Sequence, residues 1–279
     1  MHSADAIKVS PTTSWGINGE YMNGGVGKKV ETGMNASESA ANAEFGIDLR
    51  DISVSFKGRV IFSNACISAK RGEVVGFIGP NGSGKSTMLR VLAGLVVPRR
   101  GDGYVLGCRL DSCQRSAFGM MFENPPFIEE KTGSENLVLL ARLKGMRQAD
   151  VVLQCRNCME RVGLDCNLSA PVKRYSQGMR KRLGLAQALL GFPSFYLLDE
   201  PMNGLDPLGV IIMRNCIQEL ADQGSIVVIS SHLLDELERV CSKVYMFHAD
   251  AVFQVAPKED GAGWLERAYV EHVVGKPIR

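Results

Sequence analysis

A glycine-rich run that holds one lysine and three hydroxyl side chains is the first part of the chain that could do chemistry. Residues 79–87 read GPNGSGKST and match the pattern G-x-x-x-x-G-K-[ST], whose glycines let consecutive backbone N–H groups turn toward a phosphate. The lysine of this pattern reaches the β- and γ-phosphates of a nucleotide, and the next hydroxyl ligates Mg²⁺. A plain glycine turn between a strand and a helix is the alternative. The residues expected to bind phosphate are Gly79, Asn81, Gly82, Ser83, Gly84, Lys85, Ser86 and Thr87, with Ser86 also on the metal.

Two carboxylates that follow a short apolar run could complete this chemistry. Residues 195–200 read FYLLDE, so a buried strand would deliver Asp199 to the carboxyl edge of a sheet, where ligands bind in open α/β sheets. There Asp199 can hold Mg²⁺ through water, and Glu200 is positioned to polarise a water that attacks the γ-phosphate. A strand that simply stops at charged residues is the alternative. The phosphate loop upstream favours the catalytic interpretation.

These residues need strands and helices in a regular order to meet. Apolar runs predict strands at 74–78, 117–122, 195–198 and 225–229, and helical spacing predicts helices at 87–95, 135–144, 151–162 and 176–190. The helix over 176–190 has a basic start, Arg180, Lys181 and Arg182. Alternation over 47–56 and 60–69, with Gly58 between them, predicts an antiparallel hairpin. The fold class expected is α/β, with a mainly parallel sheet, helices on both faces and an antiparallel part at the N-terminal side.

Composition narrows the function classes. The 279 residues carry 32 Lys and Arg against 30 Asp and Glu, so a concentrated basic surface and a nucleic-acid partner are not expected. The uncharged stretch 184–198 is too short for a bilayer and is split by Pro193, so we expect no membrane span.

The eight cysteines are expected to be reduced thiols of a cytoplasmic protein, because no secretory segment precedes the body. Cys155, Cys158 and Cys166 suggest a metal site as an alternative, but no second pair follows at zinc-ligand spacing.

The chain divides by composition into three parts. Residues 1–45 are rich in small and polar types and predict a disordered tail, whereas the folded body is expected over 46–256, with a C-terminal extension over 257–279.

Three further segments narrow the class of phosphate-loop protein. Residues 175–179 read YSQGM and begin the basic helix, with Ser176 lying 23 residues before Asp199. Residues 203–207 read NGLDP, and residues 230–232 read SSH. Together with the phosphate loop and the carboxylates, this ordered set resembles the motifs of the ATP-binding cassette (ABC) ATPases, over about residues 47–255.

The resemblance implies a nucleotide-binding core with an inserted helical subdomain, here about residues 124–182. It also implies that two cassettes, identical or related, pair head to tail and hold each ATP between one phosphate loop and the other subunit's signature. The family's signature reads L-S-G-G-Q, so only Ser176 and Gly178 match and are expected on the γ-phosphate. For Ser176 the alternative is an ordinary helix N-cap.

Other single residues take their expected roles from the same resemblance. His232 matches the family's switch histidine, which contacts the γ-phosphate and orients water, and Asp206 matches a position that communicates across the dimer. Phe56 falls where an aromatic stacks on adenine, or it is a core residue at a strand end. Glu123 stands where the family usually has a glutamine that reaches Mg²⁺; an ionised carboxylate can accept but not donate. A solvated loop residue is the alternative for Glu123.

The function implied is the ATP-binding and hydrolysing subunit of an ABC transporter, which uses ATP and Mg²⁺ and works with a separate membrane permease from the cytoplasmic side of the membrane. Glu123 followed by Asn-Pro-Pro is similar to the exporter branch. The alternative is a soluble ABC ATPase without a transport role. Ribosomal members would carry two cassettes, and chromosomal members a long coiled coil, whereas 90 residues without heptads separate Ser176 from Ser86 here. A phosphate-loop kinase would lack the signature and the switch histidine.

Overall fold

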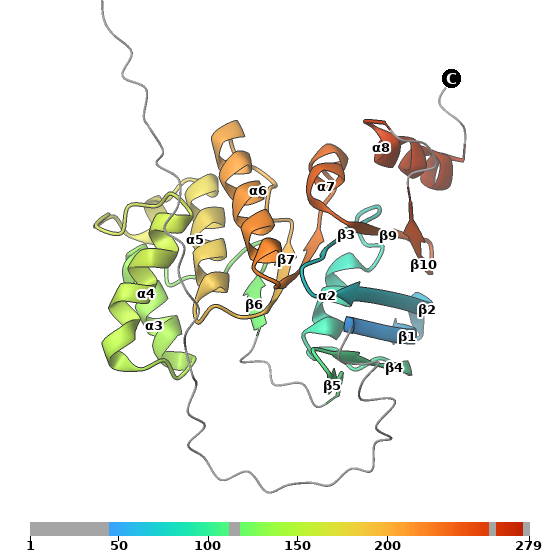
Figure 1. The fold of residues 1–279 in the computed structure, drawn as a ribbon, viewed down its shortest axis with the longest axis horizontal. Helices are drawn as coiled ribbons and strands as arrows, with labels where there is room; N and C mark the ends of the chain where they lie inside the picture. The colour runs from blue at the N-terminus through green and yellow to red at the C-terminus, as the bar shows by residue number, and fades with distance from the viewer. Residues whose placement is uncertain (1–44, 112–117, 257–260, 276–279) are drawn as a thin grey trace, which may run out of the picture. The chain divides into compact units, whose positions relative to one another are not determined.

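A six-stranded sheet forms the centre of the computed structural model, which describes residues 45–111, 118–256 and 261–275 (Figure 1). Its strand order is β10-β9-β3-β8-β7-β6; the neighbouring pairs from β9 to β6 are parallel and β10 is antiparallel to β9. The strands are β3 (Val74–Ile78), β6 (Phe118–Met121), β7 (Phe195–Asp199), β8 (Ile226–Ser230), β9 (Lys243–His248) and β10 (Ala251–Val255). The predicted, mainly parallel sheet is confirmed.

A second, antiparallel sheet has the order β2-β1-β4-β5. Its strands are β1 (Phe45–Phe56), β2 (Arg59–Lys70), β4 (Arg100–Val105) and β5 (Cys108–Arg109). The predicted hairpin is confirmed: β1 and β2 pair through a turn at Gly58, whose φ of 82° suits glycine.

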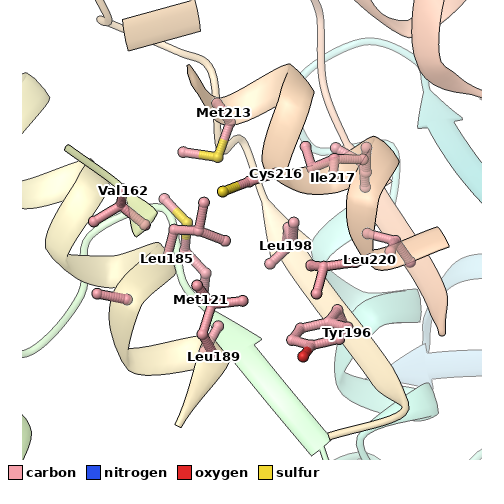
Figure 2. Packing of buried hydrophobic residues seen from close by; sticks show 14 of the residues in the cluster. Met121, Val162, Leu185, Leu189, Tyr196, Leu198, Met213, Cys216, Ile217 and Leu220 are labelled. Carbon is pink, nitrogen blue, oxygen red and sulfur yellow. The ribbon is translucent and has the colours of Figure 1, made fainter. Parts of the chain in front are cut away.

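The central strands separate two hydrophobic cores. Along β7, Phe195 and Leu197 pack into one core, and Tyr196 and Leu198 pack into the other, because successive side chains of a strand point to opposite faces. Burial on both faces explains why these strands are uninterrupted apolar runs in the sequence. Figure 2 shows the second core between β7 and the helices α5 and α6.

In the described part of the chain, four helices pack directly on the two faces of the central sheet. Helix α2 (Lys85–Leu92) packs into the core of Phe195, together with the antiparallel sheet. The helices α5 (Gln177–Leu189), α6 (Pro207–Asp222) and α7 (Leu234–Val240) pack into the core of Tyr196. The prediction of helices on both faces is therefore confirmed.

A helical region is inserted between β6 and β7. It contains α3 (Gly133–Leu143), α4 (Gln148–Arg161), the short 3₁₀ helix η2 (Val172–Arg174) and the start of α5. A capping box begins α3: Thr132 Oγ1 accepts the N–H of Glu135, and the Glu135 carboxylate accepts the N–H of Thr132. The inserted helices share the core of Tyr196 with the sheet.

After β10, the chain forms α8 (Trp264–Tyr269) and the π-helical turn η3 (Val270–Val274). The Glu238 carboxylate on α7 accepts the N–H groups of Gly263 and Leu265 at 2.7 and 3.2 Å, and the Leu265 side chain is fully buried. The described part of the C-terminal extension is therefore attached to the helix that follows His232.

The predicted helix at 87–95 is wrong at both ends. Helix α2 begins at Lys85, because Gly84, with a φ of 108°, ends the loop directly before it. It ends at Leu92, before Gly94 with a φ of 64°. The predicted tail over 1–45 lies outside the described residues apart from Phe45. Within the described part of the chain, no helix has the length and apolar content needed to cross a membrane.

Candidate active site

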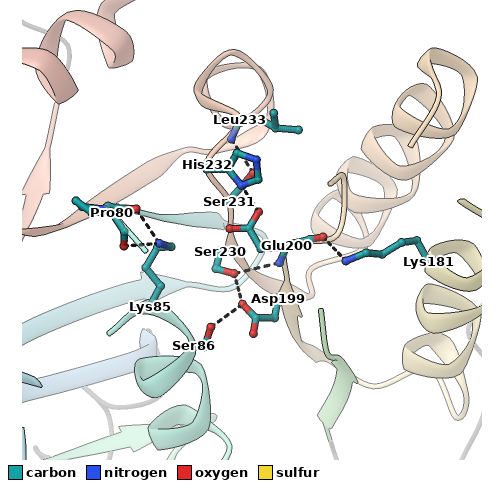
Figure 3. A network of polar contacts seen from close by, with 11 residues as sticks. Pro80, Lys85, Ser86, Lys181, Asp199, Glu200, Ser230, Ser231, His232 and Leu233 are labelled. Atoms are coloured by element: carbon teal, nitrogen blue, oxygen red, sulfur yellow. Dashed lines mark hydrogen bonds and ion pairs between the residues drawn. The ribbon is translucent and has the colours of Figure 1, made fainter. Parts of the chain in front are cut away.

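The carboxyl ends of four parallel strands bring the predicted site residues together. The phosphate loop follows β3, Glu123 follows β6, Asp199 ends β7 and His232 follows β8. Asp199 pairs in register with Ser230, which in turn lies beside Phe77 of β3. Segments from distant parts of the sequence thus meet at one sheet edge (Figure 3).

The phosphate loop bends in a way that its glycines allow. Gly79 has a φ of 149°, and a Cβ on it would collide with the backbone carbonyl of Phe247. At Gly82, with a φ of 78°, a Cβ would meet nothing, so the loop is open there. The side-chain oxygen of Ser83 is buried without a hydrogen-bond partner among the described residues, so this loop holds a polar group that a ligand could satisfy.

Lys85 lies in the first turn of α2 and folds back onto the loop. Its Nζ donates to the carbonyl oxygens of Gly79 and Pro80 at 2.7 and 3.1 Å, and the residue is buried. Burial lowers the pKa of Lys85, and the nearby Glu200, Asp199 and Glu123 oppose that shift. Because backbone carbonyls are neutral, a phosphate would be a stronger partner for this ammonium.

The Ser86 hydroxyl and the Asp199 carboxylate lie close together and could both ligate one metal ion. Ser86 Oγ donates to Asp199 Oδ1 at 3.1 Å, and Ser230 Oγ donates to the same oxygen. A hydroxyl and a carboxylate are the ligands that Mg²⁺ prefers, so the residues present fit the metal that the motifs imply.

Glu200 and His232 are in direct contact at this edge of the sheet. His232 Nδ1 lies 2.9 Å from Glu200 Oε2, and the Glu200 side chain is 11% exposed, whereas that of His232 is 50% exposed. Burial raises the pKa of Glu200, an effect that His232 and Lys85 oppose. A buried carboxylate with a raised pKa beside an accessible imidazole is suited to take a proton from water.

Sequence reasoning missed two residues that hold Glu200. Ser230 provides both its backbone oxygen and its Oγ as acceptors for the Glu200 N–H, each at 3.1 Å. Lys181 Nζ donates to the Glu200 carbonyl oxygen at 2.8 Å. The available signal for Lys181 was its spacing: it lies four and eight residues before the buried Leu185 and Leu189, on the buried face of α5.

The signature residues are at a helix start, as expected. Ser176 is exposed and caps α5, with its Oγ accepting the N–H of Met179 at 3.2 Å. Gly178 needs neither a positive φ nor a tight fit, since an added Cβ would have its nearest neighbour, Leu205 Cδ2, at 3.7 Å. The chain itself therefore does not explain this glycine, which leaves room for an approaching molecule.

Asp206 caps α6 in the same way, because its Oδ1 accepts the N–H of Gly209 at 2.9 Å. Phe56 ends β1 and is 48% exposed, so the core alternative for it is wrong. Glu123 is exposed and lies within electrostatic reach of Lys85 and Lys181. The roles of these three residues toward a ligand or partner stay predictions.

Cys155 and Cys158 are buried on α4, where burial raises their thiol pKa values to about 11 and about 12. Thiols in such a setting are inert toward metals and oxidants at neutral pH.

Comparison with known proteins identifies the family. The family model described as "ABC transporter" matches residues 62–203, from β2 through the phosphate loop to the residues after Glu200. The chain belongs to the ABC transporter family. Because members of this family bind and hydrolyse ATP, this ABC protein is an ATPase, and the predicted family and function are confirmed.

Individual relatives of this ABC ATPase agree with that result. The uncharacterized ABC transporter ATP-binding protein YhcH of Bacillus subtilis (strain 168) is 35% identical over 219 residues, which cover 77% of this chain and 70% of YhcH. The lantibiotic transport ATP-binding protein SrtF of Streptococcus pyogenes is 30% identical over 229 residues, which cover 82% of this chain and 97% of SrtF.

A solved ATP binding subunit of an ABC transporter has the same fold as this ABC ATPase. It superposes with a TM-score of 0.67 at 30% identity and covers 75% of this chain and 90% of its own. The predicted α/β cassette fold is therefore confirmed.

Proposed function

We propose that this chain is the ATPase subunit of a two-component exporter, in which ATP-driven pairing of two cassettes moves a separate membrane permease. The observation that carries the proposal is the meeting of Lys85, Asp199, Glu200 and His232 at one edge of the central sheet. Lys85 comes from the start of α2, Asp199 and Glu200 from the end of β7, and His232 from the segment after β8.

Binding of ATP begins at the phosphate loop. The open backbone at Gly82, the start of α2 and the Lys85 ammonium form a cradle of positive charge for the β- and γ-phosphates. Lys85 exchanges two neutral carbonyl partners for phosphate oxygens, which offsets the cost of its burial. The half-exposed ring of Phe56 is the proposed platform for adenine.

Ser86 and Asp199 would hold Mg²⁺, Asp199 through water and Glu123 as a further acceptor. When bound, the metal supplies charge neutralisation at the β- and γ-phosphates. The remaining chemistry lies with the chain: Glu200 accepts a proton from the attacking water, and His232 keeps the carboxylate and the water in line.

The second cassette is the proposed source of the signature contact. Ser176 and Gly178 lie at a helix start where a Cβ on Gly178 would meet its nearest described side-chain atom, Leu205 Cδ2, only at 3.7 Å. A γ-phosphate held by another cassette could approach these backbone N–H groups closely. Whether the second cassette is identical or related, Asp206 would lie at the same interface.

The proposal of a separate permease on a membrane rests on two observations. The described residues contain no membrane-crossing helix, and this chain matches 97% of SrtF, a protein named for lantibiotic transport. A cassette of this kind would act from the cytoplasmic face of the membrane and export its substrate. The Glu123-Asn124-Pro125-Pro126 segment after β6 is the proposed contact toward the permease.

Co-purification with membrane proteins encoded by neighbouring genes tests the proposal. We expect the complex to hydrolyse ATP faster than the cassette alone. In inside-out vesicles, we expect it to move substrate into the lumen only when ATP and Mg²⁺ are present. A cassette that hydrolyses ATP but binds no neighbouring membrane protein would favour the soluble, non-transport alternative.

A further inference from the structure

Three consecutive cations occupy the fourth to sixth positions of helix α5, and each contacts a different part of the protein. Cations near a helix N-terminus are disfavoured by the helix dipole, and α5 has no acidic residue in its first turn to offset them. Arg180 forms a two-pronged ion pair with Glu129, at 2.6 and 2.5 Å, and Arg182 donates to the Gly163 carbonyl at 2.9 Å. Lys181, between them, points toward Glu200.

Lys181 is the most deeply buried of the three, with 4% of the residue exposed. Burying an ammonium group is costly unless it finds strong partners, and burial lowers the pKa of Lys181. The carboxylates of Glu123, Glu200 and Asp199 act in the opposite direction. Lys181 Nζ donates a hydrogen bond to the Glu200 carbonyl oxygen, at 2.8 Å.

The backbone of Glu200 has a conformation that needs such support. Its φ is 49°, in the left-handed region where a non-glycine residue is strained. The Glu200 N–H is held by Ser230, and its carbonyl by Lys181 and, at 3.4 Å, by the N–H of Asn203. A strained conformation persists only where several contacts enforce it, and Lys181 is the closest of the carbonyl partners.

We propose that Lys181 is a positioning residue for Glu200: its ammonium group holds the Glu200 carbonyl, so that the start of the signature helix α5 sets the backbone conformation that presents the carboxylate to His232. Lys181 itself touches no reacting atom. The inference rests on the proposed role of Glu200 in hydrolysis.

Replacing Lys181 with Met in the full-length chain removes the donor and keeps the length and apolar stem of the side chain. We expect kcat for ATP hydrolysis to fall by about tenfold to a hundredfold, because a small displacement of a reacting group has an effect of that size. The KM and the affinity for a fluorescent ATP analogue are expected to change by less than about twofold, since the phosphate loop is untouched. Lys181→Gln, which keeps an N–H donor, is expected to recover part of kcat.

Arg182→Met is the matched control, because it removes one cation from the same helix turn without touching Glu200. We expect its kcat to equal that of the wild type within about twofold. If Arg182→Met lowers kcat as much as Lys181→Met does, the effect belongs to the helix and the inference fails.

A double variant separates positioning from general damage. If Lys181 acts through Glu200, adding Lys181→Met to Glu200→Gln should leave the residual turnover unchanged, since the group being positioned no longer takes a proton. A further fall by the full factor of the single variant would overturn the inference. It would also fail if Lys181→Met had wild-type kcat, or if neither Lys181 variant folded, as thermal melts would show.

The same set of variants distinguishes this inference from the proposed function. If Glu200→Gln alone keeps wild-type turnover, the proposed role of Glu200 is wrong. If Glu200→Gln is inactive while Lys181→Met turns over like the wild type, only the positioning of Glu200 by Lys181 is wrong.

Discussion

His232 Nδ1 lies 2.9 Å from Glu200 Oε2, although 32 residues separate the two in the chain. The pair forms because β7 and β8 are parallel neighbours, so Glu200 and His232 follow strands that end at the same sheet edge. The imidazole is the exposed member and the carboxylate the buried one. The imidazole is therefore open to solvent, whereas the carboxylate is largely shielded from it.

Glu200→Gln should retain ATP binding and lose hydrolysis, because the amide keeps the shape of the side chain and loses the base. We expect kcat to fall by about a hundredfold to ten-thousandfold. Steady-state phosphate release measures the rate, and size-exclusion chromatography with ATP should show an accumulated dimer. A monomer with unchanged turnover would contradict the assignment.

Lys85→Ala should abolish ATP binding or weaken it until hydrolysis is lost, because it removes the ammonium that meets the phosphates. Loss of a charged hydrogen-bonding partner predicts at least a roughly tenfold to hundredfold weaker affinity. Binding of a fluorescent ATP analogue measures it, and Lys131→Ala on the surface serves as the control. Near-normal turnover of Lys85→Ala would exclude the phosphate-loop assignment.

Glu200→Gln should also change how stability depends on pH. The pKa of Glu200 is raised in the folded chain by burial, so the folded state holds the proton more tightly than the unfolded state. The stability that this adds is complete below the unfolded pKa and is lost as the pH rises through the folded pKa. The neutral amide avoids that loss, so the variant should melt higher than the wild type at neutral pH, with the difference vanishing in acid.

Thermal melts without nucleotide, across a pH series, test this expectation. A Glu200→Gln protein that melts lower than the wild type at neutral pH would mean that the contact with His232 outweighs the burial of the carboxylate.

Gly178→Ala should separate stability from function. The added Cβ has room, and alanine in the first turn of α5 should stabilise the chain by up to about 1 kcal/mol. If a nucleotide held by a second cassette must approach Gly178, the same methyl group should lower turnover by about tenfold. Chemical denaturation and ATPase assays give the two values; unchanged turnover in the more stable variant would remove Gly178 from the site.

Variants of Glu123 test whether an acceptor oxygen is needed at this position. If Glu123 contacts the metal or the permease, Glu123→Ala should lower turnover by more than Glu123→Gln does, by about tenfold, because Ala removes the oxygen altogether. Hydrolysis against Mg²⁺ concentration, with and without the permease, measures this. Glu130→Gln, at another exposed position of the same loop, is the control. Equal behaviour of all forms would make Glu123 a solvated surface residue.

The sequence was informative where chemistry demands a fixed spacing. Motifs that follow an apolar strand made it possible to name the phosphate loop, Asp199, Glu200 and His232. The apolar runs themselves predicted the strands that precede these motifs. The contacts of Ser230 and Lys181 with Glu200 could not be predicted, because both residues act on its backbone; the spacing of Lys181 indicates only that it lies on the buried face of α5. The contact of Ser230 depends on the register of β7 and β8, and that of Lys181 depends on which face of α5 is buried.

Some elements lacked a clear periodic pattern. Strand β4, with the sequence RGDGYV, has two glycines and little alternation, so only its pairing with β1 makes it a strand. Helix α6 carries a start signal that a motif-based interpretation does not use, namely Asp206 followed by Pro207 at the first helical position.

Strands β7 and β8 are buried on both faces, which affects how this protein unfolds locally. Backbone amides of such strands exchange with solvent through the largest unfolding events, whereas helix ends and edge strands open in smaller ones. Asp199 and Ser230, paired in register at the ends of these strands, should keep their geometry while the antiparallel sheet or the inserted helices open and close around them. Amide hydrogen exchange would record this as slow exchange in β7 and β8, next to Asp199 and Ser230, and faster exchange at the start of α5. Helices and edge strands could then open without disturbing the contact between these two residues.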